Sequence, residues 1–271
     1  MGVLNLTPDS FSDGARYQLE SADAFQVDLA KALAQVDAMV AGGAGIIDVG
    51  GESTRPGADK VSLEEELTRV IPVIELIEQH HDVLISVDTS RAEVMKRAIL
   101  AGADIVNDVR ALSDPGCLDL IKAEGVAVCL MHMQGEPGTM QSSYHYTNVV
   151  SDVYDFLEQR LEYCIASGIA KDQLIVDPGF GFGKSTQHNF QLLNHLGDFL
   201  HLGRPVLIGV SRKSMLGNVT GRPVGERLAA SVAAATLALQ RGAKIVRAHD
   251  VADTVDAIKV HCVTENPELV T

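Results

Sequence analysis

Apolar, β-branched segments alternate with helix-like segments along nearly the whole chain. Eight short apolar runs stand out, at residues 2–6, 46–50, 84–88, 105–109, 126–133, 174–178, 205–211 and 244–248. Continuous Ile and Val runs are typical of strands that are buried on both faces of a parallel sheet. Because a helical pattern follows nearly every run, the sequence predicts a (β/α)₈ TIM barrel of class α/β, with a doubly wound open sheet as the alternative.

Local signals mark where several helices begin and end. Ser62 with Glu65, and Ser90 with Glu93, match the spacing of a capping box at a helix start. Three strings share a glycine suited to the end of a helix, followed at once by strand residues: GAGIID (43–48), GADIVND (102–108) and GAKIVRAH (242–249).

Two predicted helices have informative faces. Residues 21–41 predict one helix, because apolar side chains recur at spacings of three or four: Phe25, Leu29, Leu33, Val36 and Val40. Residues 224–241 are Ala-rich and apolar nearly all round, whereas a barrel helix needs only one apolar face. Either a second copy of the chain or the protein's own loops would cover the other face, and the first reading predicts a homodimer.

Composition narrows the class of protein. The chain has 271 residues and no linker or low-complexity tract, which predicts a single domain over residues 1–271. Its formal charge of −14 repels phosphate backbones, so we expect no nucleic-acid partner. No stretch approaches the roughly 18 apolar residues of a membrane span, and no signal peptide opens the chain. We therefore expect a cytoplasmic protein with reduced thiols at Cys117, Cys129, Cys164 and Cys262.

Polar side chains stand at the carboxyl end of every predicted strand, where barrels carry their sites. In chain order they are Asn5, Glu52, Ser53, Thr54, Arg55, Asp88, Asn107, Asp108, His132, Asp177, Ser211, Arg212, Lys213, Arg247 and His249. Any one of them could be a cap or a turn residue. Buried together in an empty pocket they would cost about 1–3 kcal/mol each, so the set predicts a polar ligand.

This set divides into two groups by chemistry. Arg55, Arg247 and His249 are cationic or can become so, and they suit a phosphate or diphosphate. Asn5 can donate a hydrogen bond or ligate a metal through oxygen. The other group mixes donors and acceptors and suits a flat heterocycle such as a pterin or guanine: Asp88, Asn107, Asp177 and Lys213.

Other signals argue against a phosphate loop, a catalytic triad and a histidine metal site. The string PGFGFGKS (178–185) is similar to a phosphate loop, but Pro178 and Lys184 stand where two such motifs need glycine. We expect its glycines to allow close backbone approach to a ligand, with Phe180 or Phe182 packing nearby. No Ser-His-Asp arrangement stands out in the sequence. Five histidine positions show no metal-ligand spacing and indicate surface or packing roles: His80, His81, His188, His201 and His261.

Taken together, eight motifs resemble those of the dihydropteroate synthases, a family of pterin-binding enzymes. They follow in order along nearly the whole chain: GVLNLTPDSFSDG (2–14), DVGGESTRPGA (48–58), SVDTSRAEV (86–94), IVNDV (105–109), LMHMQGEP (130–137), DPGFGFGK (177–184), GVSRKSMLG (209–217) and RAHDV (247–251). Members usually carry further residues before the first strand, and we expect such a leader to affect stability more than chemistry.

The resemblance implies a reaction and its small-molecule substrates: 6-hydroxymethyl-7,8-dihydropterin diphosphate and 4-aminobenzoate give 7,8-dihydropteroate and diphosphate, with Mg²⁺ beside Asn5. It implies catalytic roles for Asp88, Lys213, Arg247 and His249. It implies pterin contacts from Asp88, Asn107, Met131, Asp177, Gly181, Phe182 and Lys213. It implies diphosphate contacts from Asn5, Thr54, Arg55, Arg247 and His249, and aminobenzoate contacts from Phe11, Thr54, Pro56 and Ser211. Residues 7–14 and 52–60 would then close over the site, which also implies sensitivity to sulfonamides.

Three alternatives remain at this stage. A pterin-binding methyltransferase barrel would share the Asp and Asn pterin contacts but would need a corrinoid partner. It would have no use for the diphosphate group of Arg247 and His249. A non-catalytic pterin or folate binder would not need Asn5, Arg247 or His249, and all three are present. A generic sugar-phosphate barrel enzyme accounts for fewer of the motifs.

Overall fold

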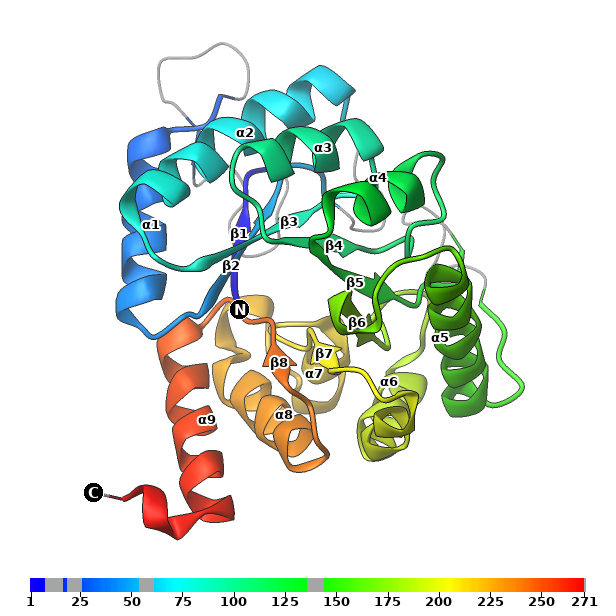
Figure 1. The fold of residues 1–271 in the computed structure, drawn as a ribbon. Helices are drawn as coiled ribbons and strands as arrows, with labels where there is room; N and C mark the ends of the chain where they lie inside the picture. The colour runs from blue at the N-terminus through cyan, green and yellow to red at the C-terminus, as the bar shows by residue number, and fades with distance from the viewer. Residues whose placement is uncertain (8–16, 19–25, 54–60, 136–143, 271) are drawn as a thin grey trace.

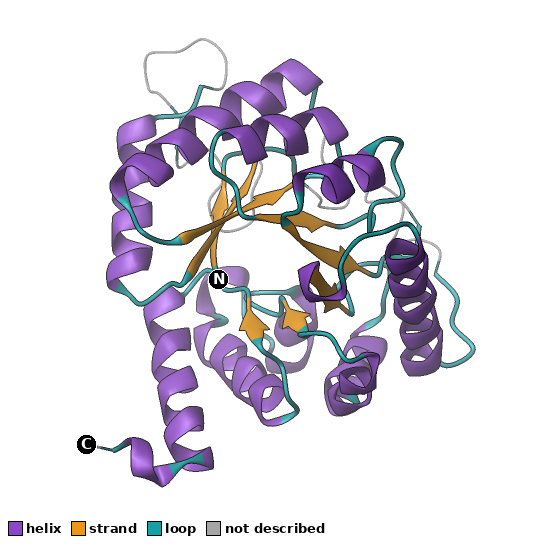
Figure 2. Ribbon diagram, viewed as in Figure 1, coloured by secondary structure: helices purple, strands orange, loops and turns teal. Residues whose placement is uncertain are grey.

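Eight parallel strands form the centre of the computed structural model, which describes residues 1–7, 17–18, 26–53, 61–135 and 144–270. Figures 1 and 2 show the strands surrounded by helices. The strands are β1 (Gly2–Asn5), β2 (Ile46–Gly50), β3 (Leu84–Asp88), β4 (Ile105–Asp108), β5 (Ala127–Met131), β6 (Leu174–Asp177), β7 (Leu207–Ile208) and β8 (Ile245–Val246). Every predicted strand is confirmed, although several end one to three residues earlier than their apolar runs.

Single bridges close the ring of strands. Strands β1 to β6 pair in sequence order and β7 pairs with β8. Val176 bridges to Val206 between β6 and β7, and Gly2 bridges to Ala248 between β8 and β1. The closing contact is a pair of backbone hydrogen bonds, from Val3 to the carbonyl of Ala248 and from Ala248 to that of Met1. A closed ring of parallel strands is a (β/α)₈ barrel, so the open-sheet alternative is wrong.

Helices pack on the outside of the ring. They are α1 (Leu29–Ala41), α2 (Leu63–His80), α3 (Ala92–Leu100), α4 (Cys117–Glu124), α5 (Val149–Ala166), α6 (Thr186–Asn194), α7 (Ser214–Thr220), α8 (Leu228–Gln240) and α9 (Val251–Glu265). Short 3₁₀ turns lie at Lys171–Gln173, Leu196–Leu202, Val224–Glu226 and Pro267–Leu269. The large apolar core lies between helices and strands.

A second, smaller apolar cluster fills the lower part of the barrel interior. Its buried members are Ile105, Cys129, Ile175 and Leu207. Side chains alternate across a strand, so the next inward position after Ile105 is Asn107, and the next after Ile175 is Asp177. The interior is therefore apolar near the start of the strands and polar at their carboxyl ends. This layering directs a ligand to the carboxyl end.

The start of the first helix departs from the sequence prediction. The helix predicted over residues 21–41 begins at Leu29, because the Asp28 side chain caps it by accepting from the Lys31 amide at 3.1 Å. Residues 26–28 are not helical, and Phe25 lies outside the described residues. The capping box of Ser62 and Glu65 is confirmed.

The second predicted capping box, at Ser90, is wrong. Its hydroxyl donates to Asp108 at 2.5 Å, and α3 starts without a side-chain cap. Asp108 also accepts from the amides of Arg110 and Leu112 at 2.8 and 2.7 Å. This carboxylate therefore holds the turn after β4, where Leu112 has a positive φ of 58°. Asp108 therefore has a structural role, although the sequence placed it among the polar residues expected to bind a ligand.

Within the described residues, no helix is both long enough and apolar enough to span a membrane. Helix α8 confirms the Ala-rich helix but is shorter than the predicted 224–241, since Val224–Glu226 form a 3₁₀ turn. It leaves Leu228 and Leu237 about 40% exposed, at 39% and 41%. That exposure agrees with an uncovered second face, and the homodimer stays a prediction. Three of the four thiols are buried, as expected, and Cys262 is exposed.

Candidate active site

Strand register brings the polar residues of the first four strands onto one level. Asn5 pairs with Gly50, Gly50 with Asp88, and Asp88 with Asn107. A Cβ at Gly50 would lie 3.6 Å from the Asn5 side-chain oxygen and 3.5 Å from the Asp88 Cβ. Asn5 and Asp88 therefore flank a position without a side chain. Glycine at 50 leaves space between an amide oxygen and a carboxylate at the strand ends.

Arg247, which follows β8, ion-pairs with two carboxylates across the barrel. Its Nε donates to Asp48 Oδ2 at 2.6 Å, and its Nη2 donates to Asp88 Oδ2 at 3.0 Å. Asp48 is fully buried and also accepts from Ser86 at 2.6 Å and Asn107 at 3.2 Å. This one carboxylate holds side chains of three other strands or strand ends. It therefore fixes the guanidinium group and the Asn107 amide in place.

Burial perturbs the carboxylates of this cluster. Burial raises the pKa of Asp88 to about 7, and the negative charges of Asp48, Asp108 and Glu66 add to that rise while Arg247 opposes it. The Asp88 carboxyl consequently changes charge near neutral pH in the ligand-free protein. Strong pKa perturbation of a group at a cleft is typical of functional sites.

Asp177, at the end of β6, is the second buried carboxylate of the site. It is 6% exposed, and its Oδ1 accepts from the Gly179 amide at 2.7 Å. Burial raises its pKa, and the positive charge of Lys213 opposes that rise first among the neighbouring groups. One edge of the carboxylate is thus fixed by backbone. Met131, whose backbone pairs in register with Asp177, is 3% exposed.

Lys213 connects the end of β7 to the loop after β6. Its ammonium donates to the Phe180 carbonyl, and it lies 4.7 Å from the centroid of the Phe182 ring. Burial lowers the pKa of Lys213 to about 8, with Asp177 opposing the change. A Cβ at Gly181, where φ is +82°, would press to 3.3 Å from the Lys213 side chain. Glycine at this position allows the loop to pass close beside the lysine.

Ser211 and His249 form a contact between the ends of β7 and β8. The Ser211 hydroxyl lies 3.0 Å from His249 Nδ1 and accepts from the His249 amide at 3.2 Å. Burial lowers the pKa of His249 to about 3, and the charges of Arg247 and Arg212 lower it further. The imidazole is therefore neutral in the ligand-free protein, and an anion bound beside it would raise its pKa.

A magnesium ion would find little protein ligation among the described residues, which contain no cluster of three His, Cys, Asp or Glu side chains suited to a metal. Asn5 offers one side-chain oxygen beside the opening at Gly50. Mg²⁺ commonly takes one or two protein oxygens and completes its shell with water and substrate phosphates. The Asn5 side chain fits that pattern of ligation.

Comparisons with known proteins agree with this geometry. The sequence model of the family described as pterin binding enzyme matches residues 1–249. The chain belongs to this family. The dihydropteroate synthase of Haemophilus influenzae is 52% identical over 266 residues, which cover 98% of this chain and 94% of that protein.

Two solved structures of family members show the same fold. One is a Yersinia pestis dihydropteroate synthase in complex with a sulfonamide drug, with a TM-score of 0.92, 47% identity, and 98% and 93% of the two chains covered. The other is a Xanthomonas albilineans dihydropteroate synthase in complex with 7,8-dihydropteroate, with a TM-score of 0.85, 43% identity, and the same two coverages.

The structure gathers most of the residues that the family resemblance nominates. Those it describes at the carboxyl ends of the strands or in the loops that follow are Asn5, Asp88, Asn107, Met131, Asp177, Gly181, Phe182, Ser211, Lys213, Arg247 and His249. Phe11, Thr54, Arg55 and Pro56 lie outside the described residues. The predicted contacts of these four residues, and closure by the loops that carry them, stay predictions.

Sequence reasoning missed Asp48 as a member of the site. Its signal was a carboxylate inside the apolar run IIDVG, at an inward position two residues before the strand end. A charged residue there needs a buried partner. The partner, Arg247, lies 199 residues away along the chain, so no local pattern could name it.

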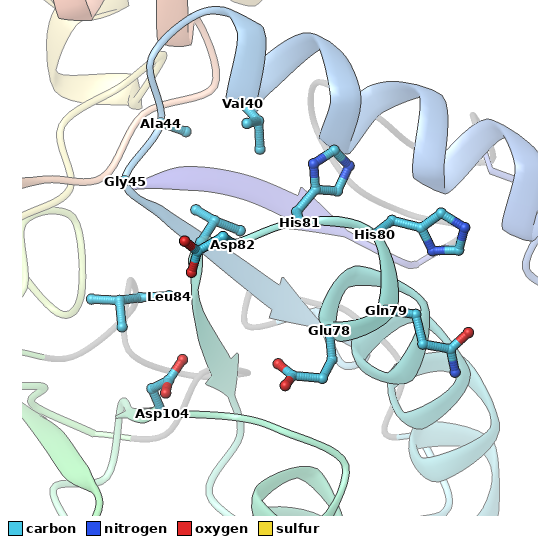
Figure 3. A pocket seen from close by; sticks show the side chains of 11 residues that line it. Val40, Ala44, Gly45, Glu78, Gln79, His80, His81, Asp82, Leu84 and Asp104 are labelled. Atoms are coloured by element: carbon cyan, nitrogen blue, oxygen red, sulfur yellow. The ribbon is translucent and has the colours of Figure 1, made fainter.

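One hollow among the described residues lies at the opposite end of the barrel. It measures about 710 Å³ and is lined by residues that include Glu78, His80, Asp82, Leu84 and Asp104. Figure 3 shows them around the start of β3 and the end of α2. Their side chains are exposed, and none is held by a buried ion pair of the kind seen at Arg247. We therefore place the site at the carboxyl ends of the strands, despite the size of this hollow.

Proposed function

We propose that the chain joins 6-hydroxymethyl-7,8-dihydropterin diphosphate to 4-aminobenzoate, giving 7,8-dihydropteroate and diphosphate. The observation that carries the proposal is the buried charge cluster in which Arg247 bridges Asp48 and Asp88. It places a cation for an anionic leaving group next to acceptors for a heterocycle. The relatives named for this activity, one of them solved with 7,8-dihydropteroate, support the same proposal.

The pterin is bound through its polar edges. Asp177 accepts two hydrogen bonds from the exocyclic amine and the adjacent ring N–H, since its Oδ1 is already oriented by the Gly179 amide. Asn107 and Asp88 bind further polar atoms of the ring, and Lys213 donates to the carbonyl. The walls of the slot are Met131, Gly181 and Phe182.

The diphosphate leaves from the side of Arg247. The C–O bond breaks, its electron pair stays on the diphosphate, and the positive charge spreads over the electron-rich dihydropterin. Arg247 stabilises the departing anion, and His249 donates to it once protonated or through its neutral N–H. Asp88 offsets the positive charge of the ring. Asn5 would hold Mg²⁺ through its side-chain oxygen, and the ion would supply further positive charge toward the diphosphate.

The amine of 4-aminobenzoate completes the reaction. Its nitrogen lone pair forms the new C–N bond, and the nitrogen then loses a proton to solvent. Ser211 is the described residue that we assign to this half of the site, next to His249. No protein nucleophile is needed, because the bond to diphosphate breaks before the amine attacks. Water has to be excluded, since it would capture the same cation.

The experiment is a product assay with the purified protein. Dihydropterin diphosphate and 4-aminobenzoate are supplied with Mg²⁺, and then with excess chelator. We expect dihydropteroate with the metal and little or none with the chelator. Absence of product under both conditions would refute the proposed reaction. Equal product under both would refute the metal requirement alone.

One control separates the proposed reaction from the methyltransferase alternative. Arg247→Met removes the cation for the diphosphate but leaves Asp177 and Asn107 in place. We expect it to abolish product formation while the protein still binds 6-hydroxymethylpterin without a diphosphate, measured by calorimetry. An Arg247→Met protein that forms dihydropteroate at the wild-type rate would contradict the assignment of the diphosphate site.

The setting of the activity is part of the proposal. We propose a single-domain homodimer in the cytoplasm, with the exposed leucines of α8 as part of the subunit contact. We also propose competitive inhibition by sulfonamides, supported by the relative solved with such a drug. Sedimentation equilibrium tests the homodimer, and competition against 4-aminobenzoate in the product assay tests the inhibition.

A further inference from the structure

Lys184 is a buried cation that the proposed reaction does not use. It lies in the segment between β6 and α6 and is only 3% exposed. Its Nζ lies 2.9 Å from His132 Nδ1, 3.3 Å from the His132 carbonyl, 2.8 Å from the Gly179 carbonyl and 2.9 Å from the Phe182 carbonyl. One side chain thus joins the end of β5 to both halves of the loop after β6.

The partners of Lys184 define its chemistry. Three of the four are carbonyl oxygens, which can only accept a hydrogen bond. Burial lowers the pKa of Lys184, yet a neutral amine has only two N–H groups for these acceptors. The ammonium form meets three of them directly, so we assign the charged form. Burial also lowers the pKa of His132 to about 2, so its ring stays neutral and Nδ1 can accept.

The loop that Lys184 holds is packed backbone against backbone. A Cβ at Gly179 would fall 1.9 Å from the His132 carbonyl oxygen, and one at Gly183 would fall 2.4 Å from the Gln134 carbonyl oxygen. Both glycines have positive φ, +71° and +62°. Tyr146 adds an outer contact, because its hydroxyl donates to the Gly183 carbonyl at 2.8 Å. The loop therefore has one position relative to β5, and the lysine is at its centre.

Both ends of this loop contact residues that we assign to the pterin site. The Gly179 amide donates to Asp177, while the Gly179 carbonyl accepts from Lys184. The Phe182 carbonyl accepts from Lys184, while the Phe182 ring lies against the Lys213 ammonium. Lys184 thus orients the two peptide units that set the Asp177 carboxylate and the Phe182 wall. Its positive charge also acts on Asp177, where it opposes the rise in pKa caused by burial.

We infer that Lys184 is a positioning residue for the pterin half of the site, which fixes the Gly179–Phe182 loop against His132 so that Asp177 and Phe182 are preorganised for the ring. This role rests on the proposed function. It acts without contact to the substrate, through backbone carbonyls. It also explains why PGFGFGKS is similar to a phosphate loop without being one: the lysine turns inward to its own loop and to β5.

The test compares Lys184→Met with the wild-type protein. Methionine keeps the length of the buried side chain but cannot donate. We expect the Kd for 6-hydroxymethyl-7,8-dihydropterin diphosphate, measured by calorimetry, to rise about 10- to 100-fold, because a misplaced loop costs that order of binding and rate. The KM for 4-aminobenzoate, measured at saturating pterin, should change less than about threefold.

A matched control separates positioning from loss of stability. Ile121→Ala removes a fully buried side chain from α4, away from the β6 loop, and lowers Tm without touching the site. If Ile121→Ala weakens pterin binding as much as Lys184→Met does, the positioning role is refuted. An unchanged pterin Kd in Lys184→Met would refute it as well.

A second variant keeps the test decisive if Lys184→Met does not fold. Tyr146→Phe removes only the outer contact to Gly183. We expect it to raise the pterin Kd in the same direction, by about two- to fivefold. An unchanged Kd in Tyr146→Phe would then overturn the inference.

Hydrogen exchange distinguishes this inference from the proposed function. In the ligand-free protein the amides of residues 179–183 should exchange faster in whichever of the two variants folds than in the wild type. If the wild-type protein does not bind the pterin at all, the proposed function fails, but faster exchange in Lys184→Met would still establish that Lys184 fixes the loop. Unchanged exchange would overturn that claim whatever the wild type binds.

Discussion

The two ends of the barrel differ in the burial and pairing of their charged and polar side chains. At the carboxyl ends of the strands, Asp48, Asn107 and Asp177 are between 0% and 6% exposed and are held by ion pairs or hydrogen bonds. At the amino ends, Glu78 and Asp82 are exposed around a hollow of about 710 Å³ (Figure 3). The hollow at the amino ends therefore has the weaker electrostatic environment.

Buried and paired polar groups therefore mark the site, whereas a hollow alone does not. A buried carboxylate is costly unless it is paired, and keeping several of them together needs a compensating role. An exposed carboxylate in a wide hollow costs almost nothing, so its presence there has little meaning. Substitutions of the same type at both ends test this contrast.

The largest expected effect is on stability, at Asp48. Asp48→Asn leaves Arg247 without its fully buried carboxylate partner, and we expect it to lower the free energy of unfolding by about 3–5 kcal/mol. The control is Asp104→Asn at the amino end, where the side-chain oxygen still accepts from the Ile85 amide. Urea denaturation measures both. Equal losses would break the contrast between the two ends.

Next in size is the effect on pterin binding at Asp177. Asp177→Asn keeps an oxygen for the Gly179 amide but loses the charge that strengthens hydrogen bonds to the ring. We expect the pterin Kd to rise about 100-fold, in line with the strength of charge-assisted bonds. Glu78→Gln, in the hollow at the other end, should leave that Kd unchanged. Calorimetry would contradict the account if Glu78→Gln had the larger effect.

The next prediction concerns how the free energy of unfolding depends on pH through Asp88. The pKa of Asp88 is raised from its ordinary value of 3.8 to about 7, so in that window the folded protein keeps a proton that the unfolded chain has lost. By linkage, this group makes the folded state less stable as pH rises through the window. Asp88→Asn removes the effect.

The free energy of unfolding of Asp88→Asn relative to wild type should therefore increase by about 3 kcal/mol between pH 4 and pH 7. Other buried carboxylates are common to both proteins and cancel in the difference. Denaturation at a series of pH values measures it. A difference that does not vary with pH would show that burial of Asp88 does not shift its titration.

Least affected should be the amino end itself. Leu84 starts β3 and is 49% exposed beside the hollow. We expect Leu84→Gln to change the free energy of unfolding by no more than about 0.5 kcal/mol, as is usual for exposed positions, and to leave both substrate KM values unchanged. A shifted pterin KM would give the amino end a role that the account denies it.

The sequence predicted the architecture because its signals are local. Runs of Ile and Val appear wherever a strand is buried on both faces, so all eight strands could be located from neighbouring residues. Strands β7 and β8 are shorter than their runs, with two residues each, since they join the rest of the ring largely through single bridges and loop hydrogen bonds. Periodicity alone overextended α1, which a cap at Asp28 shortens.

Only those site residues that lie at strand ends or in family motifs could be predicted from the sequence. Asp88, Asn107 and Asp177 could be named because they lie at or near the carboxyl ends of apolar runs. Asp48 and Lys184 could not, because each has a decisive partner in another part of the fold: Arg247 is 199 residues from Asp48, and His132 is 52 residues from Lys184. Such pairs follow from closure of the barrel, which no window of sequence contains.

Hydrogen exchange with and without 6-hydroxymethyl-7,8-dihydropterin diphosphate tests the central claim most directly, because it reports on both ends of the barrel in one experiment. The account predicts that the ligand slows exchange of the amides of Asn107, Gly179 and Phe182 at the carboxyl end. It predicts no change for the amides of His81 and Leu84 beside the hollow. Protection at His81 and Leu84, with none at Gly179 and Phe182, would contradict the assignment of the site.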